Sequence, residues 1–233
     1  MISERYRYNE RIHSGVDFSN AQEVAVYDSY MQKLRNMEPE IEKVKSIVRL
    51  GSSDVVLDVG AGTGALAIGL AKHCKKVFAI DVSKAMIDYA EQKASEQENI
   101  PIVFSHAGFL TFLLPPETLD VVVSQFALHH LPDFWKSIAL KRIFAAMKPG
   151  GRFFLQDCVL PSTVDDYDKY FAEVVSRIET TGGEKAARDT EKTFRNEFVT
   201  LDWIMTELLE KAGFRIISRE YSVPFINTYL CLK

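Results

Sequence analysis

The sequence predicts an α/β protein with a doubly wound parallel sheet. Short runs of Val, Ile, Leu and Phe alternate along the chain with longer stretches in which apolar residues recur at helical spacing. The first two runs carry an acidic residue at their carboxyl ends, and the first leads directly into a glycine-rich loop. Strands and helices that alternate in this way form a parallel sheet with helices on both faces.

The first predicted strand covers residues 55–59. It is short, mostly β-branched and followed by Gly60, Gly62 and Gly64 at every second position, which predicts a buried strand running into a tight loop. Residues 65–73 then have helix-forming composition. Missing side chains in the loop let a ligand lie against the backbone, and the N–H groups that open the helix point toward that ligand.

Asp58 decides between two interpretations of this loop. The pattern Gly60-x-Gly62-x-x-Ala65 also satisfies a loose dinucleotide fingerprint. Asp58 lies at the carboxyl end of its strand, where parallel sheets bind ligands. A carboxylate there would repel a pyrophosphate and attract a sulfonium amino acid, so the dinucleotide interpretation is disfavoured.

The second predicted strand, residues 77–81, ends in Asp81, which lies 21 residues after Gly60. Nucleotide-binding α/β proteins place there the carboxylate that binds the ribose hydroxyls. A carboxylate can accept two O–H hydrogen bonds from such a diol. Ser83 is expected to cap a helix that runs to residue 97.

The remaining elements follow from the same patterns. Strands are predicted over residues 102–105, 119–124 and 152–157, and a helix over 134–147 precedes a turn at 148–151. Thr200 is expected to cap a helix over 201–212, which Gly213 ends, and two closing strands cover 214–221 and 225–231.

Three motifs together resemble class I S-adenosylmethionine (SAM) methyltransferases that act on small molecules, similar to the methyltransferase domain 11 and 25 families. They are the glycine loop with Asp58 and Asp81, the segment Ala127-Leu128-His129-His130-Leu131-Pro132, and Lys148-Pro149-Gly150-Gly151. The resemblance covers residues 45–160 well and 200–233 in outline. It implies a Rossmann-like sheet of seven strands in the order 3-2-1-4-5-7-6, the last antiparallel. It also implies SAM as cofactor and S-adenosylhomocysteine as product.

The resemblance implies a cofactor site at the ends of the first four strands. Many relatives carry an acid near position 108 or 109 that binds the adenine amine, but this chain has Gly108 and Phe109, so backbone carbonyls or stacking by Phe109 would have to replace it. The predicted cofactor residues are Asp58, Gly60, Ala61, Gly62, Gly64, Asp81, Val82, Met86, Ala107, Gly108, Phe109 and Gln125.

His130 is the candidate general base, because histidine titrates near neutral pH. The alternative is a packed residue that holds its loop. Adjacent histidines point different ways and make a poor metal pair, so we expect His129 and His130 to bind no metal. A strong catalytic dyad is not required, because the sulfonium is already a good leaving group and the enzyme mainly aligns the nucleophile and excludes water.

The domain is predicted to span residues 51–233, with a helical substrate cap inserted at about 161–199. Residues 1–50 form an arm with helices near 20–37 and 39–50. Its aromatic residues, Tyr27 among them, either anchor the arm or line a lid over the ligand. In the insertion, a helix over 164–180 carries Tyr167 and Phe171 on one face, and Thr181-Gly182-Gly183 breaks it. Tyr27, Asp157, Tyr167 and Phe171 are the candidate substrate residues.

The overall composition limits the classes of binding partner that we expect for this protein. The net charge is −4 without a basic tract, three cysteines lie far apart, and no apolar run approaches membrane-spanning length. We expect a cytoplasmic monomer or homodimer that binds neither nucleic acid nor membranes and methylates a small molecule. Methylation of a protein or RNA, a SAM-binding module without turnover and, less favoured, a nicotinamide dehydrogenase remain as alternatives.

Overall fold

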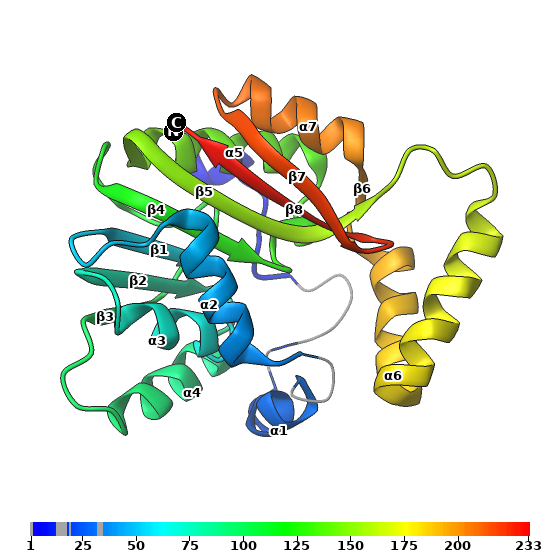
Figure 1. Ribbon diagram of the computed structural model, residues 1–233, viewed down its shortest axis with the longest axis horizontal. Coiled ribbons are helices and arrows are strands. Elements are labelled where there is room, and N and C mark those ends of the chain that lie inside the picture. The colour runs from blue at the N-terminus through cyan, green and yellow to red at the C-terminus, as the bar shows by residue number, and fades with distance from the viewer. Residues whose placement is uncertain (1, 13–17, 19, 32–34) are drawn as a thin grey trace.

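A computed structural model describes residues 2–12, 18, 20–31 and 35–233. Its central sheet has the strand order β3-β2-β1-β4-β5-β8-β7 (Figure 1). The predicted order 3-2-1-4-5-7-6 is confirmed, because the two-residue strand β6 lies off this path and raises the numbers of the last two strands by one. The strands are β1 (Val55–Val59), β2 (Lys76–Asp81), β3 (Ile102–His106), β4 (Leu119–Gln125), β5 (Met147–Leu160), β6 (Thr200–Leu201), β7 (Arg215–Val223) and β8 (Ile226–Leu232).

The first five strands of the sheet pair in parallel, whereas β8 runs antiparallel to both β5 and β7. Strand β5 is longer than the predicted 152–157. It starts at Met147, where it pairs with Leu119 before an irregularity in register, and it continues to Leu160 alongside β6. The extension carries the chain past the carboxyl edge of the sheet.

Side chains alternate between two apolar cores, as the pleat of a sheet requires. Val56 faces the core beneath α2 (Met37–Val48) and α3 (Ala65–Ala71), whereas Leu57 and Val59 face the core beneath α5 (Asp133–Ala146) and α7 (Asp202–Lys211). Helix α4 (Lys84–Ser95) follows β2 and packs on β3 (Figure 1). Both faces of the central strands β1 and β4 are therefore buried, which explains their continuous apolar runs, whereas the edge strand β3 is partly exposed.

The arm consists of η1 (Glu4–Tyr6), α1 (Ala21–Met31) and α2. The predicted helix over 20–37 is observed as α1, and residues 32–34 lie outside the described part of the chain. Helix α2 begins at Met37, so Pro39 lies in its first turn as expected. It packs closely on α3, because a Cβ atom at Gly69 would lie only 2.4 Å from Ile41 Cδ1.

The insertion is a helical hairpin, α6 (Tyr167–Asn196), whose two halves lie side by side (Figure 1). The predicted break occurs at Gly183, which has a φ of +81°. The first helix starts at 167 rather than 164, because the Asp166 side chain caps it by accepting from Lys169 N. The second half is also helical, although its polar sequence did not predict a helix, and it buries Ala186 and Ala187.

The expectation that Thr200 caps α7 is wrong. Thr200 belongs to β6, where it pairs with Val159, and its hydroxyl donates to Asp133 Oδ2 at 3.1 Å. Leu201 occupies the N-cap position without a side-chain hydrogen bond. Within the residues that the structure describes, no helix combines the length and the apolar character needed to cross a bilayer.

Candidate functional site

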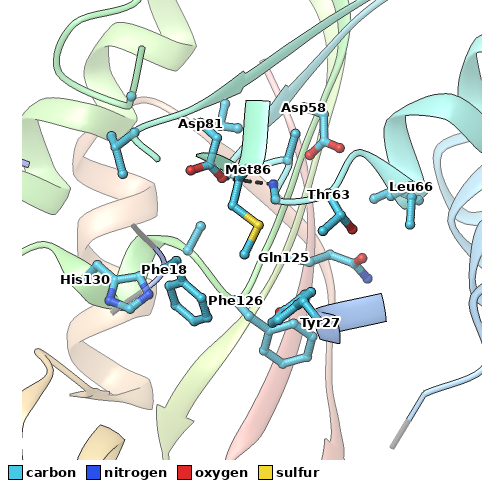
Figure 2. A pocket seen from close by; sticks show the side chains of 18 of the residues that line it. Phe18, Tyr27, Asp58, Thr63, Leu66, Asp81, Met86, Gln125, Phe126 and His130 are labelled. Atoms are coloured by element: carbon cyan, nitrogen blue, oxygen red, sulfur yellow. Dashed lines mark hydrogen bonds between the residues drawn. The ribbon is translucent and has the colours of Figure 1, made fainter. Parts of the chain in front are cut away.

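A cavity of about 340 Å³ opens at the carboxyl edge of the sheet, beyond β1, β2 and β4. Loops that follow these strands form its floor, and residues of the arm form its opposite wall (Figure 2). Ligands bind at this edge in open α/β sheets because helix N-termini and strand ends converge there.

The three glycines of the loop have different structural roles. All have positive φ, at +78° for Gly60, +53° for Gly62 and +74° for Gly64. A Cβ atom at Gly60 would lie 2.2 Å from the Ala127 Cβ atom, so this glycine lets the loop after β4 approach. At Gly64 it would press on the side chains of Ala90 and Phe104. At Gly62 it would meet nothing within 4 Å, which leaves open space against the backbone.

Asp81 ties the glycine loop to the end of β2. Its Oδ2 atom accepts from Gly62 N at 2.9 Å, and its Oδ1 atom accepts from Ser83 N at 2.8 Å (Figure 2). Ser83 in turn caps α4, as predicted, by accepting from Met86 N. These bonds hold the carboxylate at the cavity wall, where its remaining lone pairs can accept from a ligand.

Asp58 is a buried acid of the site. Only 2% of its surface is exposed, and among the described residues no donor reaches its Oδ2 atom. Burial, together with the carboxylate of Asp81, raises the pKa of Asp58 to about 7, and the charge of Arg35 opposes this rise. A buried carboxylate without a donor is costly unless a ligand supplies one, so its place in the cavity favours a ligand with a cationic donor.

The far end of the cavity is closed by Glu10 of the arm. Its carboxylate lies over Gly108, where a Cβ atom would come within 2.5 Å of it. It accepts from Leu110 N at 3.0 Å and from Thr111 Oγ1 at 2.7 Å. Burial raises the pKa of Glu10, and these hydrogen bonds oppose the rise. The arm therefore places an acid against the loop that lacks one in its own sequence.

The backbone of the loop after β3 is held from the opposite side. Arg142 of α5 donates through Nε to the Phe109 carbonyl at 3.1 Å, and it also donates to the Phe112 carbonyl. Phe109 is only 5% exposed and belongs to the core. Most of its ring is therefore occupied by core contacts, although the residue does reach the cavity wall.

Polar contacts fasten the arm over the middle of the cavity. Asp28 of α1 accepts from the Thr63 hydroxyl and forms an ion pair with Lys93 of α4. Arg35 donates to Gln125 Oε1 at 2.9 Å. These contacts join the arm to three separate segments of the domain.

Arg35 and two aromatic side chains complete the same wall. The Arg35 guanidinium pairs with Glu40 and lies 4.7 Å from the centre of the Phe126 ring. Phe18 packs edge-on against Tyr27 at 5.8 Å. The arm thus lines the cavity with the rings of Phe18 and Tyr27 (Figure 2) as well as with charged side chains.

The two histidines of the fourth loop have separate surroundings. His130 lines the cavity near Phe18, with ring centres 6.3 Å apart. His129 is buried between Asp157 and Glu197. Burial acts to lower the pKa of His129, but the two carboxylates outweigh it and raise the value to about 9.

Most of the predicted site residues come together at the cavity. Those that line it are Tyr27, Asp58, Gly60, Ala61, Gly62, Asp81, Val82, Met86, Gly108, Phe109, Gln125 and His130. Those that do not are Gly64, Ala107, Asp157, Tyr167 and Phe171.

The three substrate candidates outside the cavity each make contacts elsewhere in the fold. Asp157 is fully buried and accepts from His129 N at 3.0 Å. The Tyr167 hydroxyl donates to the Pro161 carbonyl at 3.0 Å, and Phe171 stacks on Phe194 at 4.6 Å. These contacts anchor the hairpin and the end of β5.

Several cavity residues carried no signal in the sequence. They come from the arm, from α4 and from the loops after β1 and β4: Glu10, Phe18, Asp28, Arg35, Thr63, Lys93 and Phe126. Only the aromatic character of the arm pointed toward this wall. Phe126 has a φ of +54°, which is uncommon for a residue with a side chain, and nothing in its sequence context indicates that conformation.

Comparison with known proteins is consistent with this geometry. Residues 56–151 match a family model described as a methyltransferase domain. An uncharacterized methyltransferase of Geobacillus kaustophilus is 29% identical over 187 residues, which cover 80% of this chain and 81% of the relative. The matched domain contains β1 to β4 and the loops that form the cavity floor.

Two solved structures share the fold. A SAM-dependent methyltransferase from Aquifex aeolicus superimposes with a TM-score of 0.64 at 20% identity, covering 91% of this chain and 98% of the other. Phosphoethanolamine N-methyltransferase 2 of Haemonchus contortus, in complex with SAM, gives a TM-score of 0.70 at 16% identity, covering 94% of this chain and 60% of the other.

The different surroundings of Gly60 and Gly62 can be tested by alanine substitution. Gly60→Ala combines a positive φ with a collision against Ala127, and we expect it to lower the free energy of unfolding by about 2 kcal/mol or more. Gly62→Ala has the φ cost alone and should lose about 1 kcal/mol. Denaturant unfolding measures both, and equal losses would contradict the assigned role of the Ala127 contact.

Proposed function

We propose, from the premise that this chain is a class I SAM-dependent methyltransferase, that it transfers a methyl group to a small-molecule acceptor by direct displacement. The observation that carries the proposal is the cavity at which three groups meet: the buried carboxylate of Asp58, the carboxylate of Asp81, and Gly62 with free space beside its backbone. These groups fit SAM, because Asp58 needs a cationic donor, Gly62 leaves room against the backbone, and Asp81 can accept from a diol.

The predicted cofactor residues would each contact a different part of SAM, according to their chemistry. Asp58 and the glycine loop would hold the amino acid part, and Asp81 the ribose. Val82 and Met86 would pack on the adenine, with Glu10 near its amine. When bound, SAM supplies an electrophilic methyl group on a sulfonium that leaves as a neutral thioether.

The chain itself has to align the acceptor and exclude water. Phe18, Tyr27 and Phe126 line the wall nearest the loop after β4 and present apolar surface there. We therefore expect an acceptor with apolar character. For a hydroxyl acceptor, His130 would take the proton, so that the acceptor's O–H bond breaks and a new N–H bond forms on the imidazole. A thiol, an amine or an acidic carbon could react through positioning alone.

The arm's cover over the cavity favours a small acceptor over a protein or RNA. Residues of α1 and Arg35 line the cavity and contact three parts of the domain. A macromolecule would have to displace them. Residues 1–50 accordingly serve as a closing arm in this proposal, and the helical insertion within 161–199 of the domain 51–233 supplies none of the described residues that line the cavity.

The function is tested by binding and then by transfer. Calorimetric titration should detect SAM and S-adenosylhomocysteine but neither NAD nor NADP, and Asp81→Asn should weaken the adenosyl ligands about tenfold or more. SAM labelled in its methyl group is then incubated with cell extract. Label in the small-molecule fraction supports the proposal. Label that is found on macromolecules and is released by protease or nuclease indicates methylation of a protein or RNA instead. SAM binding without transfer of label to any fraction indicates a SAM-binding module without turnover.

Asp58 predicts a proton release on cofactor binding. In the ligand-free protein its pKa is about 7, so near pH 6.5 it is largely protonated, whereas a bound ammonium or sulfonium favours its ionised form. Binding of SAM at that pH should release a proton, and affinity should rise as the pH increases toward 8. Titrations in buffers of different ionisation heat count the proton. Asp58→Asn should abolish the release, and an unchanged count would contradict this role.

Glu10 predicts how the adenine amine is bound. Glu10→Gln should weaken S-adenosylhomocysteine about tenfold, because a carboxylate accepts from an amine more strongly than an amide does. Glu4→Gln, an exposed acid of η1, serves as the matched control. S-inosylhomocysteine lacks the amine and should bind wild type and Glu10→Gln equally well. A similar loss with both ligands would mean that Glu10 acts only by holding the arm.

A further inference from the structure

A buried cluster of charges lies directly behind His130. The ring of His129 is held between Asp157 of β5 and Glu197, the residue that follows α6. Nδ1 contacts Asp157 Oδ1, and Nε2 lies 3.1 Å from Glu197 Oε2. All three residues are at least nine-tenths buried. Nothing in the predicted cofactor site uses this cluster.

The surroundings of His129 favour its protonated form. Both ring nitrogens lie beside carboxylates, and the charges of Asp157 and Glu197 stabilise the imidazolium. Burial acts to raise the pKa of Glu197, but the hydrogen bond and charge of His129 lower it to about 2. Two carboxylates and one imidazolium leave the cluster with one excess negative charge.

Backbone contacts hold Glu197 in place. Phe198 N donates to the His129 carbonyl at 2.9 Å, and the Phe198 carbonyl accepts from Lys136 Nζ. Lys136 is itself fully buried and pairs with Asp133 at 2.7 Å. The end of the hairpin is therefore fastened to the loop that carries both histidines, and the position of the carboxylate is set by the fold.

Glu197 also faces the candidate base. Its Oε1 atom lies 3.9 Å from His130 Nδ1, which is an ion-pair distance, and the rings of His129 and His130 are 4.3 Å apart. We propose that Glu197 is a positioning residue for His130: it favours the tautomer with a proton on Nδ1 and stabilises the imidazolium that forms when Nε2 takes the acceptor's proton. This role rests on the proposed function of His130 as a base. The proton leaves the acceptor oxygen, its electron pair stays on that oxygen, and the new charge on His130 lies beside a carboxylate.

Through Glu197 the end of the hairpin thereby contributes to the chemistry of the site. His130 is bordered by Glu197 from the end of α6, by His129 on its own turn and by the Phe18 ring of the arm. The charged residues that share the cavity with it are Glu10, Asp28, Arg35, Asp58, Asp81 and Lys93. Of the carboxylates that the structure describes, Glu197 is the one whose ion pair with His130 is seen directly.

The test is a histidine titration of the full-length chain followed by NMR. The chain has five histidines, and the His130→Gln variant assigns the resonance of interest. Glu197→Gln keeps the shape but removes the charge, and it should move the titration midpoint of His130 to lower pH by about one unit or more. Glu184→Gln, an exposed acid on the same hairpin, is the matched control and should leave the midpoint in place.

A second variant covers the case in which Glu197→Gln does not fold. Glu197→Asp retains the negative charge but moves it away from His130 by one methylene. The titration midpoint of His130 in this variant should therefore lie below that of the wild type, by less than the shift expected when the charge is removed. A His130 midpoint that is the same in the wild type and in every folded Glu197 variant overturns the proposal.

These measurements need neither cofactor nor acceptor. The proposed role of Glu197 can therefore be contradicted even if the protein binds SAM. It can also be supported even if no methyl acceptor is found in the cell extract. Once an acceptor is known, the acidic limb of the pH–rate profile should move with the NMR midpoint in Glu197→Gln, a shift that a merely structural role would not produce.

Discussion

The burial of Asp58 is the constraint on which the site depends. A carboxylate at the end of a central strand, cut off from water and without a donor on one oxygen, is unfavourable in the ligand-free fold. The sheet tolerates it because β1 is fixed by neighbours on both sides, β2 and β4, and because the apolar cores on either face leave it no alternative position. The glycine loop and Asp81 are arranged around that carboxylate, so a cationic ligand gains what the protein alone lacks.

Much of this floor could be predicted, because its signals are local. A strand ending in an acid, glycines at every second position and a second acid after the next strand are each dictated by backbone geometry within one strand–loop–helix unit. The strand order followed from the resemblance of the same motifs. The errors lie where a tertiary contact overrides a local preference. Thr200 has the chemistry of a cap but pairs with β5 instead, and residues 184–196 form a helix whose Phe194 stacks on Phe171 of the first half of the hairpin.

The residues that form the walls of the site could not be predicted, because they are brought there by tertiary contacts between segments far apart in the sequence. Glu10 lies 100 residues before the amide of Leu110 to which it bonds, and Arg35 lies 90 residues before Gln125. Glu197 reaches His129 across the whole length of β5 and the hairpin. A single sequence carries no periodicity or spacing that joins such positions, since each is an ordinary charged residue in a polar segment. Only the fold of the arm and the insertion brings them to the strand ends.

The charges around the cavity lead to one last inference about its occupant. Among the described residues, the lysine and arginine side chains that line it are Arg35 and Lys93, and they form ion pairs with Glu40 and Asp28 respectively. Neither is engaged with Asp58, although Arg35 is near enough to oppose the rise in its pKa. The protein has thus placed its cations where they fasten the arm rather than where they would neutralise the buried acid. A buried carboxylate whose Oδ2 atom receives no hydrogen bond from the described residues favours a ligand that brings positive charge to the floor of the cavity.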